Sequence, residues 1–419
     1  MALAVPALLS CSKTPQEQKV PDRPEKTTST GFIYVQGRSL MKPDKTAFEM
    51  KGVDLDGWLC PDGELFGFTE IRAERDVNLM LCQIAGPKKA ASFWKRHKDS
   101  FVTKEDISFI AECGANTVRV PLDWRLFSDD VDFMGLASDQ DGFSRLDDLF
   151  SWCREAGLYV ILDMKATPGG HSGDWSDNDG GYPWLFGGKA RQTEFTRIWS
   201  AVAGRYKDEE CLVGYEIMDS PLCFEEDCEG LLSKVEPLCR KCVKAIRAVD
   251  KKHVIILDAV LGGYDFSCFS DYDYDDNILY AGHAMNPTAF DSVLDAAVHF
   301  REYETGLPVL LLGTATGADG HTSEMCRKMT NSNVGYTFAA YKGYNTPGPL
   351  LSVGSVEGWN VVTRFADSKR VTFDDLHVLG KFNVKDVAAA LEAFTSACRF
   401  PNCQRNTEAV SSMFGSSDK

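Results

Sequence analysis

The sequence predicts a (β/α)8 barrel, the TIM-barrel fold, for most of its 419 residues. From about residue 47 onward, short apolar runs alternate with amphipathic stretches, and eight of the runs have the length of a strand. Several runs have apolar, β-branched residues at consecutive positions, which is typical of parallel strands buried on both faces. No G-x-G-x-x-G motif follows the first run, which disfavours a dinucleotide-binding doubly wound sheet.

The elements follow in chain order. The predicted strands lie at 48–55, 116–121, 159–164, 212–218, 253–260, 278–285, 308–314 and 334–341. Helical patterns lie between or after them, at 104–114, 146–157, 191–206, 231–250, 292–303, 323–329 and 386–400. Gly114 and Gly157 are helix stop signals, and Thr103 before Glu105-Asp106 predicts a capped helix start. In a barrel the active site lies at the carboxyl ends of the strands, so the residues that end each run are the candidates.

We divide the chain into 1–11, 12–30, 31–400 and 401–419. The first segment is a short apolar run that ends in Ser10-Cys11, and it resembles a bacterial lipoprotein signal that is lipidated at Cys11 after cleavage. No basic residue precedes the run, so a misassigned start or a simple apolar tail remain as alternatives. The polar, proline-containing segment 12–30 predicts a tether, 31–400 the barrel, and 401–419 a polar tail. We expect an exported protein, lipid-anchored to a bacterial membrane at the cell surface or in the periplasm.

The net charge of −16 disfavours nucleic acid and anionic lipid as partners. No apolar stretch of spanning length follows the N-terminus, so a membrane is reached only through the lipid anchor. Most of the 14 cysteines lie in apolar patterns, as small buried hydrophobes do. Cys239-x-x-Cys242 has no second pair, so we expect no zinc site, no other metal and no cofactor. Cys223 with Cys228, or Cys398 with Cys403, could form a disulfide bond if the protein is exported, and the sequence does not decide this.

Four stretches at or near the strand ends have recognisable sequence motifs: "GVDLDGW", "FVTKEDISFIAECGANTVRVP", "LDMKATPGGHSGDW" and "DGGYPWLF". Together they resemble glycoside hydrolase family 5, the cellulase and β-glucanase barrels, over about residues 47–397. The resemblance implies the barrel fold and retaining hydrolysis of β-linked glycans. That mechanism uses two carboxyl groups about 5 Å apart, one as the acid/base and one as the nucleophile.

The two catalytic positions of the family are changed in this sequence. Members supply the acid/base from Asn-Glu-Pro at the end of the fourth strand, where this chain has Asp219-Ser220-Pro221. They supply the nucleophile from Gly-Glu at the end of the seventh strand, where this chain has Thr314 or, with a slip of one residue, Ala315. A serine hydroxyl is too weak an acid, and threonine needs an activating base. The resemblance therefore predicts a degenerate catalytic site.

The supporting positions are partly kept. Arg119 and His283 match the family's arginine on strand two and histidine on strand six, although both could equally be structural polar groups. Lys165 replaces a histidine, Met285 a tyrosine and Ala339 a tryptophan. We predict that glycan contacts come from the retained pair and from aromatic side chains near the rim, namely Arg119, His283, Trp175, Tyr182, Tyr336 and Trp359. Buried packing is favoured for Trp184 and Phe186.

Relocated carboxylates are the route by which activity could persist. Asp219 is expected to point to the opposite face from Ser220, and Glu216 to lie roughly 13 Å below the rim. Asp319 and Glu357 lie in loops, and Asp163 is expected to brace the barrel. Asp319 is the one of these that could swing into the site.

The charge balance of the site suggests a ligand class. Arg119, Lys165 and Asp219 replace one arginine and two glutamates, which shifts the local balance to slightly basic. An anionic glycan is one expectation, and an ion pair between Lys165 and Asp219 that closes the pocket is the other.

Three functions follow. The first is a non-hydrolytic family 5-like protein that binds β-linked polysaccharide or oligosaccharide. The second is an active endo-β-glycanase with relocated carboxylates. The third is a structural or interaction module of a surface glycan-use assembly.

Overall fold

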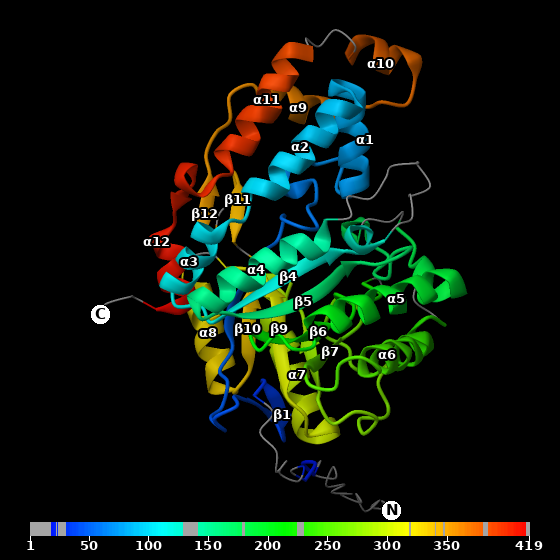
Figure 1. Cartoon of the computed structure of the whole chain (residues 1–419), viewed down its shortest axis with the longest axis vertical. Helices are drawn as coiled ribbons and strands as arrows, with labels where there is room; N and C mark the ends of the chain where they lie inside the picture. The colour runs from blue at the N-terminus through cyan, green and yellow to red at the C-terminus, as the bar shows by residue number, and fades with distance from the viewer. Residues whose placement is uncertain are drawn as a thin grey trace, which may run out of the picture.

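The computed structural model describes residues 18–21, 23, 31–128, 141–177, 181–223, 230–317, 320–339, 341–346, 348–379 and 384–415. Eight parallel strands close into a barrel in the order β10-β3-β4-β5-β6-β7-β8-β9, with helices around it (Figure 1). The predicted (β/α)8 fold and all eight strands are confirmed. The strands are β3 (Lys51–Asp54), β4 (Thr117–Asp123), β5 (Tyr159–Ala166), β6 (Leu212–Glu216), β7 (Val254–Asp258), β8 (Ile278–Gly282), β9 (Val309–Thr314) and β10 (Gly335–Phe338).

Strand register brings charged residues of different strands to one level of the barrel. Asp54 pairs with Arg119 across β3 and β4, and Asp163 pairs with Glu216 across β5 and β6. All four side chains are buried. Because parallel strands place their carboxyl ends at one rim, residues far apart in sequence meet there.

Helices surround the strands largely where the patterns predict them. They are α3 (Lys104–Glu112), α4 (Gly142–Ala156), α5 (Lys189–Tyr206), α6 (Leu232–Arg247), α7 (Phe290–His299) and α8 (His321–Asn331). Thr103 and Asp106 form the capping box that starts α3. Gly157 ends α4 in the left-handed region at φ 72°, which glycine adopts without steric cost. Short helical turns are η1 (Glu64–Phe66), η2 (Trp124–Phe127), η3 (Trp175–Asp177), η4 (Trp184–Gly187), η5 (Pro287–Ala289), η6 (Phe300–Thr305) and η7 (Phe400–Asn402).

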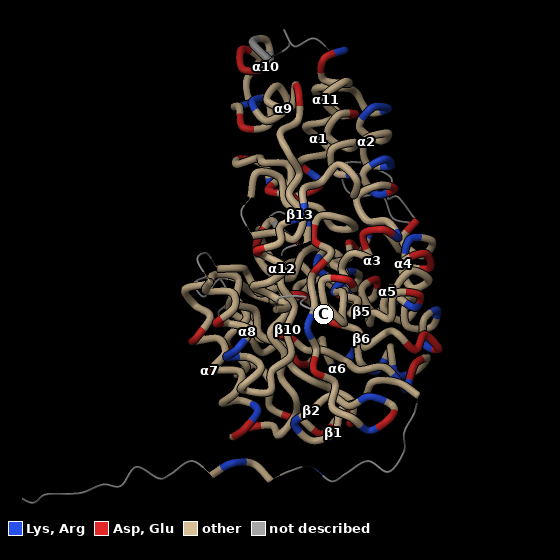
Figure 2. The backbone as a smooth tube through the Cα atoms, turned by 90° about the vertical axis from the view of Figure 1, so that its left-hand side faces the viewer, with Lys and Arg blue, Asp and Glu red and all other residues tan. Residues whose placement is uncertain are grey.

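A helical lobe extends from one end of the barrel, and both views show it (Figures 1 and 2). It consists of α1 (Glu74–Ala85), α2 (Pro87–Ser100), α9 (Trp359–Ala366), α10 (Phe373–Leu379) and α11 (Val384–Ala397). The first two follow β3 and the others follow β10, so the lobe grows from the carboxyl ends of the strands. Of these five helices, the sequence patterns identified α11 alone. Aromatic rings form the lobe's core, with Trp359 and Phe394 stacked at 4.0 Å between centroids.

A small sheet lies between the lobe and the barrel. It contains β11 (Lys342–Tyr344), β12 (Leu351–Val353) and β13 (Gln404–Arg405). The ammonium of Lys342 is fully buried and lies 2.5 Å from Asp106 Oδ1 of α3. The Tyr341 hydroxyl also donates to Asp106. We call this group, Asp106 with Tyr341 and Lys342, the joint, because it ties the lobe-side sheet to a barrel helix.

The chain ends are more ordered than the sequence predicted. The hairpin β1 (Tyr34–Gln36) and β2 (Ser39–Met41) precedes the barrel. In the expected tether, Val20 donates to the Glu302 carbonyl oxygen. The expected polar tail instead forms α12 (Thr407–Phe414), where Met413 is buried and its carbonyl accepts from the Tyr336 hydroxyl. Apolar side chains at helical spacing explain this difference.

Cys398 and Cys403 are free thiols, and the alternative pair, Cys223 with Cys228, has one member outside the described residues. Cys11 also lies outside them. Within the described ranges, no helix has both the length and the apolar character needed to cross a membrane.

Candidate functional site

A cavity of about 470 Å³ lies at the carboxyl ends of the strands, bounded by barrel residues on one side and by η1 and β11 on the other. We call it the cleft. It brings together six of the residues singled out in the sequence: Arg119, Lys165, Asp219, Ser220, His283 and Met285. Ala339 borders it as well, so the missing tryptophan of strand eight leaves a small side chain at that place.

Arg119 lies at the centre of the cleft floor, with its side chain 2% exposed. Its Nε and Nη2 donate to the two oxygens of Glu216 at 2.7 and 2.6 Å, a bidentate pair. Its Nη1 donates to Asp54 Oδ2 at 2.8 Å. Nη2 also lies 3.0 Å from Asp163 and 3.3 Å from Asp219. We call these five side chains the Arg119 cluster.

The cluster has more carboxyl groups than cations, and its pKa values show the consequence. Burial raises the pKa of Glu216 to about 8 and that of Asp54 to about 7, and Arg119 offsets only part of this effect. Burial likewise raises the pKa of Asp163 well above its usual value. Asp219 differs because the charge of Arg119, followed by His283 and Lys165, outweighs burial and lowers its pKa to about 2. Asp219 is therefore the ionised member that reaches the cleft.

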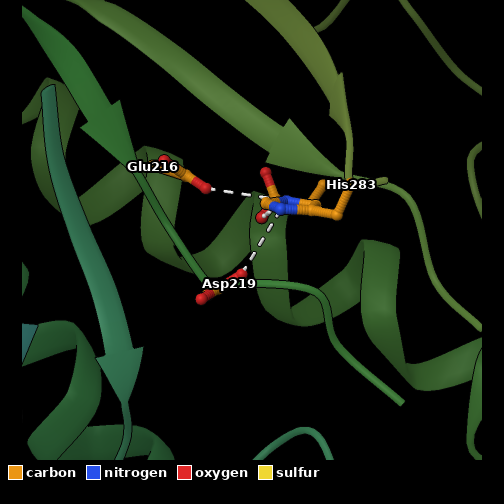
Figure 3. Close-up of side chains that lie close together, drawn as sticks. Glu216, Asp219 and His283 are labelled. Carbon is orange, nitrogen blue, oxygen red and sulfur yellow. Dashed lines mark hydrogen bonds and ion pairs between the residues drawn. The ribbon is translucent and has the colours of Figure 1, made fainter. Parts of the chain in front are cut away.

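His283 follows β8 and connects two acidic side chains of the site. Its Nε2 lies 2.8 Å from Asp258 Oδ2, and its Nδ1 lies 3.6 Å from Asp219 Oδ1. Burial lowers the pKa of His283 and raises that of Asp258 to about 7. The His283 side chain is 1% exposed, and its Nε2 lies 3.7 Å from Glu216 Oε1. Figure 3 shows the ring between Glu216 and Asp219. A neutral imidazole with fixed partners fits a positioning role in the cleft floor.

One prediction about strand β6 is wrong. Glu216, expected well below the rim, is fully buried and does not border the cleft, although it and Asp219 both lie within 4 Å of His283 (Figure 3). Asp219 and Ser220 were expected to point to opposite faces, yet both border the cleft. The cause is that β6 ends at Glu216, and the chain then turns so that Ser220 has φ 45°. The alternation of an extended strand does not apply beyond that point.

Ser220, which the sequence resemblance assigns to the acid/base position, is held firmly by its surroundings. Its backbone N–H donates to Asp258 Oδ2 at 3.0 Å. The residue is 1% exposed, and its hydroxyl makes no hydrogen bond within the described part of the chain. A positive φ at a non-glycine residue costs about 1 kcal/mol or more, so the fold keeps a strained turn here.

The structure distinguishes the two candidates for the nucleophile position. Ala315 borders the cleft together with Gly313. Thr314 is fully buried, and its hydroxyl makes no hydrogen bond among the described residues. Gly313 has φ 56°, and the register of β9 against β10 shifts near this point. This irregularity turns Ala315 into the cleft, so the slip of one residue is the alternative that the geometry favours.

Lys165 does not pair with Asp219 as one expectation had it. Its ammonium lies 3.3 Å from Asp56 Oδ1. Burial opposes its charge, yet Asp56 and then Asp62 hold the pKa of Lys165 well above its usual value. The cleft is also bordered by Asp54 and Glu64, so the prediction of a slightly basic site is wrong. The three-residue count had missed the carboxylates of the first strand end and of η1.

The aromatic predictions divide into rim and core. Trp175 and Tyr182 are 40% and 42% exposed, as expected for rim residues. Trp184 is 47% exposed rather than buried, and its ring lies 4.5 Å from that of Tyr182. Phe186 is buried as predicted. The Arg72 guanidinium lies 4.8 Å from the Trp175 ring.

Tyr336 and Trp359 are not substrate-binding residues. Tyr336 is 2% exposed and its hydroxyl donates to the Met413 carbonyl oxygen of α12. Trp359 is 1% exposed, and its Nε1 donates to the Phe66 carbonyl oxygen within the lobe core. Tyr336 is held by the unrecognised helix α12. Trp359 begins the unrecognised helix α9 and packs against Phe66, Phe93 and Phe394.

Several site residues went unrecognised in the sequence. Asp258 is the last residue of β7, Asp54 is the last residue of β3 and Asp56 follows it closely, so their position at a strand end was a usable signal. His171 had no such signal. Its Nε2 lies 2.6 Å from the Asp219 carbonyl oxygen and its Nδ1 3.1 Å from Thr167 Oγ1, which fixes the loop after β5 against the end of β6.

Of the other carboxylates, Asp163 belongs to the cluster, Glu357 is exposed outside the cleft lining, and Asp319 lies outside the described residues. Glu216, Asp219, Asp258 and His283 have ligand atoms within 4.8 Å of one another. The guanidinium of Arg119 already occupies the cation position against two of them, so we assign no metal to this group.

Comparisons with known proteins agree with this geometry. Beta-xylosidase of Phanerodontia chrysosporium is 26% identical over 261 residues, which cover 62% of this chain and 53% of the relative. Endoglucanase C of Acetivibrio thermocellus is 32% identical over 204 residues, covering 47% of this chain and 54% of the relative. The chain thus spans about half the length of the curated relatives it matches.

Solved structures show the same fold at low identity. An endogalactoceramidase has a TM-score of 0.56 at 13% identity, covering 73% of this chain and 74% of that one. A beta-glucanase from Saccharophagus degradans has a TM-score of 0.51 at 16% identity, covering 77% and 89%. The family model for cellulases of glycosyl hydrolase family 5 matches residues 76–345. With its closed barrel and the cleft at the strand ends, this chain belongs to glycosyl hydrolase family 5.

Proposed function

We propose that this family 5 barrel binds a β-linked glycan in the cleft without hydrolysing it. The observation on which the proposal rests is that Ser220 and Ala315, the residues that the sequence resemblance assigns to the family's two catalytic positions, both border the cleft. Neither side chain donates a proton to a leaving group or attacks an anomeric carbon near neutral pH. The cavity is kept while the two groups that retaining hydrolysis needs are replaced.

The remaining carboxyl groups of the cleft floor are engaged with the protein itself. Glu216 is fully buried and held by two hydrogen bonds from Arg119. Asp163 is fully buried against the same guanidinium. These contacts support a structural use of the acidic side chains.

Glycan binding is supported by the rim. Trp175, Tyr182 and Trp184 expose aromatic rings on the loop after β5, and Ser172 and Asp177 of that same loop border the cleft. Aromatic faces with polar surroundings suit sugar rings, which present apolar C–H faces and polar edges. Relatives named endoglucanase and beta-glucanase support a β-linked glucan-type ligand.

The test combines calorimetry with an activity assay on the full chain. We expect β-glucan, xylan or mannan oligosaccharides to bind and to remain uncleaved. The double variant Ser220→Glu with Ala315→Glu should gain measurable hydrolysis, whereas Ser220→Glu with Thr314→Glu, the matched control, should not. Hydrolysis by the unmodified chain well above the blank would overturn the proposal.

An active endo-β-glycanase with relocated carboxylates is the second candidate, and one observation favours it. Asp54 and Asp219 both border the cleft, and their pKa values of about 7 and about 2 separate a protonated from an ionised carboxyl group. If the unmodified chain hydrolyses any of these glycans, Asp219→Asn should abolish that activity. Asp54 is fully buried, which disfavours contact with a glycosidic oxygen.

The third candidate, an interaction module of a surface assembly, predicts no glycan binding at all, so the same calorimetry separates it from the first. We also propose export and lipid anchoring through Cys11. Metabolic labelling with a fatty acid in a bacterial host should mark the wild-type chain and not Cys11→Ser. Equal labelling of both would reject the anchor.

A further inference from the structure

The three cations that border the cleft are already engaged by the protein. Arg119 faces the carboxylates of its cluster. Lys165 pairs with Asp56. Lys342 has its ammonium fully buried against Asp106 of the joint. None of the three offers an uncompensated positive charge to a ligand, because each lies within ion-pair distance of at least one carboxylate.

Carboxylates at the mouth of the cleft have no cation in ion-pair contact among the described residues, although Asp62 lies near enough to Lys165 to help raise the pKa of that ammonium. Asp62 and Glu64 border the cleft from the η1 side. Asp62 Oδ1 accepts from the Leu65 backbone N–H at 3.2 Å, and Glu64 is exposed. Within the described ranges no lysine or arginine lies within 4.0 Å of either carboxylate. The charge that the cleft presents to a ligand is therefore negative.

The cleft floor adds a buried oxygen atom that lacks a donor. Ser220 Oγ makes no hydrogen bond within the described part of the chain, and Ser220 borders the cleft at 1% exposure. Asp219 Oδ1 also makes no hydrogen bond there, but it lies 3.3 Å from Arg119 Nη2. A buried oxygen without a partner costs about 1–3 kcal/mol, so a ligand that supplies donors is favoured. An ammonium group has three donors and no acceptor, and its charge matches the mouth.

We propose that the glycan this cleft takes bears a protonated amine, as a β-linked glucosamine oligosaccharide does. The inference rests on the proposed glycan binding and specifies its ligand class. A neutral glycan supplies hydroxyl donors but no positive charge for Asp62 and Glu64. A uronate or sulfate would add a further negative charge beside the same side chains, at a distance where like charges repel.

Calorimetry on the full chain with three oligosaccharides of equal length tests the proposal. These are β-1,4-linked glucosamine, N-acetylglucosamine and glucose oligomers, measured below the pKa of the amine. One hydrogen bond to a charged group is worth about 1.5–3 kcal/mol, so glucosamine should bind at least about tenfold more tightly than the other two. Equal binding of glucose and glucosamine oligomers would overturn this inference and leave the proposed function standing. Binding of none would overturn both.

Two double variants distinguish the effect of the cleft carboxylates on binding from the effect of the overall net charge of −16. Asp62→Asn with Glu64→Gln should remove most of the preference for glucosamine and most of its dependence on salt. Asp291→Asn with Glu304→Gln removes the same charge from exposed side chains of α7 and η6 and should leave both unchanged. Equal losses in the two double variants would show that general electrostatics, rather than the cleft, sets the preference, and would overturn the inference.

Discussion

The joint and the Arg119 cluster are two buried ionic groups with opposite construction. In the joint, one lysine meets one aspartate, and both carboxylate oxygens of Asp106 have donors. Oδ1 accepts from the Tyr341 hydroxyl and lies 2.5 Å from the Lys342 ammonium, while Oδ2 accepts from the backbone N–H and the hydroxyl of Thr103. Such a group holds the lobe-side sheet on the barrel and leaves no oxygen for a ligand.

In the cluster, one guanidinium faces four carboxyl groups, and among the described residues oxygens of Asp54, Asp163 and Asp219 have no hydrogen bond. Protons therefore balance part of the charge, as the raised pKa values of Glu216 and Asp54 indicate. The comparison teaches that this barrel has a costly, protonation-dependent floor beneath its cleft. The joint shows that a buried ion pair can hold two parts of the fold together without unsatisfied carboxylate oxygens.

The largest expected effect comes from removing the shared cation. Arg119→Met leaves Asp219 and the other carboxyl groups of the cluster without a counter-charge, and should lower the free energy of unfolding by about 3–5 kcal/mol at neutral pH. The loss should shrink in mildly acidic solution because the cluster can take up protons. Urea unfolding at the two pH values measures both effects. As a control, Arg205→Met breaks an exposed pair with Asp147 and should cost at most about 1 kcal/mol. A cost for Arg119→Met no larger than that control would show that the cluster is not held by its guanidinium.

Breaking the joint should cost less. Asp106→Asn removes the charge opposite Lys342 but keeps an oxygen for the Tyr341 hydroxyl, and should lower the free energy of unfolding by about 3 kcal/mol. The lobe should be loosened selectively because the joint lies between α3 and β11. Hydrogen exchange should therefore accelerate in β11 and β12 more than in β5 and β6. Uniform acceleration over both regions would show that the joint supports the whole fold rather than the lobe's attachment.

The pH dependence of the free energy of unfolding gives a further test of the Arg119 cluster and its neighbour Asp258. Asp258, beside the cluster, has a folded pKa of about 7, whereas an unfolded aspartate titrates near 4. Between these values the folded chain binds the extra proton, so the free energy of unfolding falls as pH rises through this window. Asp258→Asn should reduce that fall by up to about 1.4 kcal/mol per pH unit. Asp219, with a pKa of about 2, contributes stability that is lost only as the pH falls towards 2, and it does not oppose the fall in stability expected as the pH rises from 4 to 7. Denaturation curves between pH 4 and 7 test this, and Asp291→Asn, an exposed control, should leave the slope unchanged.

Sequence patterns located the barrel well because each strand is a continuous apolar run, and the run ends fixed the positions of Arg119, His283, Lys165 and Ser220 in the cleft. The same logic failed where the chain leaves regular structure. The turn at Ser220 and the irregularity at Gly313 rotate neighbouring side chains, so alternation assigned Asp219 to the wrong face and could not decide between Thr314 and Ala315.

The lobe was missed for a different reason. Its helices α1 and α2 are amphipathic, but they lie between the first two strands, where a barrel repeat needs a single helix. Trp359 then looked like a loop aromatic, because nothing in its own neighbourhood shows that Phe66, Phe93 and Phe394 cover it. Packing between segments about 300 residues apart leaves no local signal in a single sequence.

The smallest expected effect concerns backbone strain, which the cleft holds at Ser220 and the joint residues do not, since Asp106, Tyr341 and Lys342 have no positive φ. Ser220→Gly relieves a φ of 45°, worth about 1–2 kcal/mol, but glycine also gains freedom in the unfolded chain, worth about 0.4–1 kcal/mol. The net result should be a stabilisation of about 0.5 kcal/mol. Ser220→Ala keeps the strain and removes a hydroxyl that makes no hydrogen bond to the described residues, so it should be less stable than the glycine variant. Thermal unfolding of the two variants side by side measures the difference. If alanine proved the more stable residue, the turn would not be strained, and the positive φ could no longer be regarded as a feature that the barrel retains at a cost.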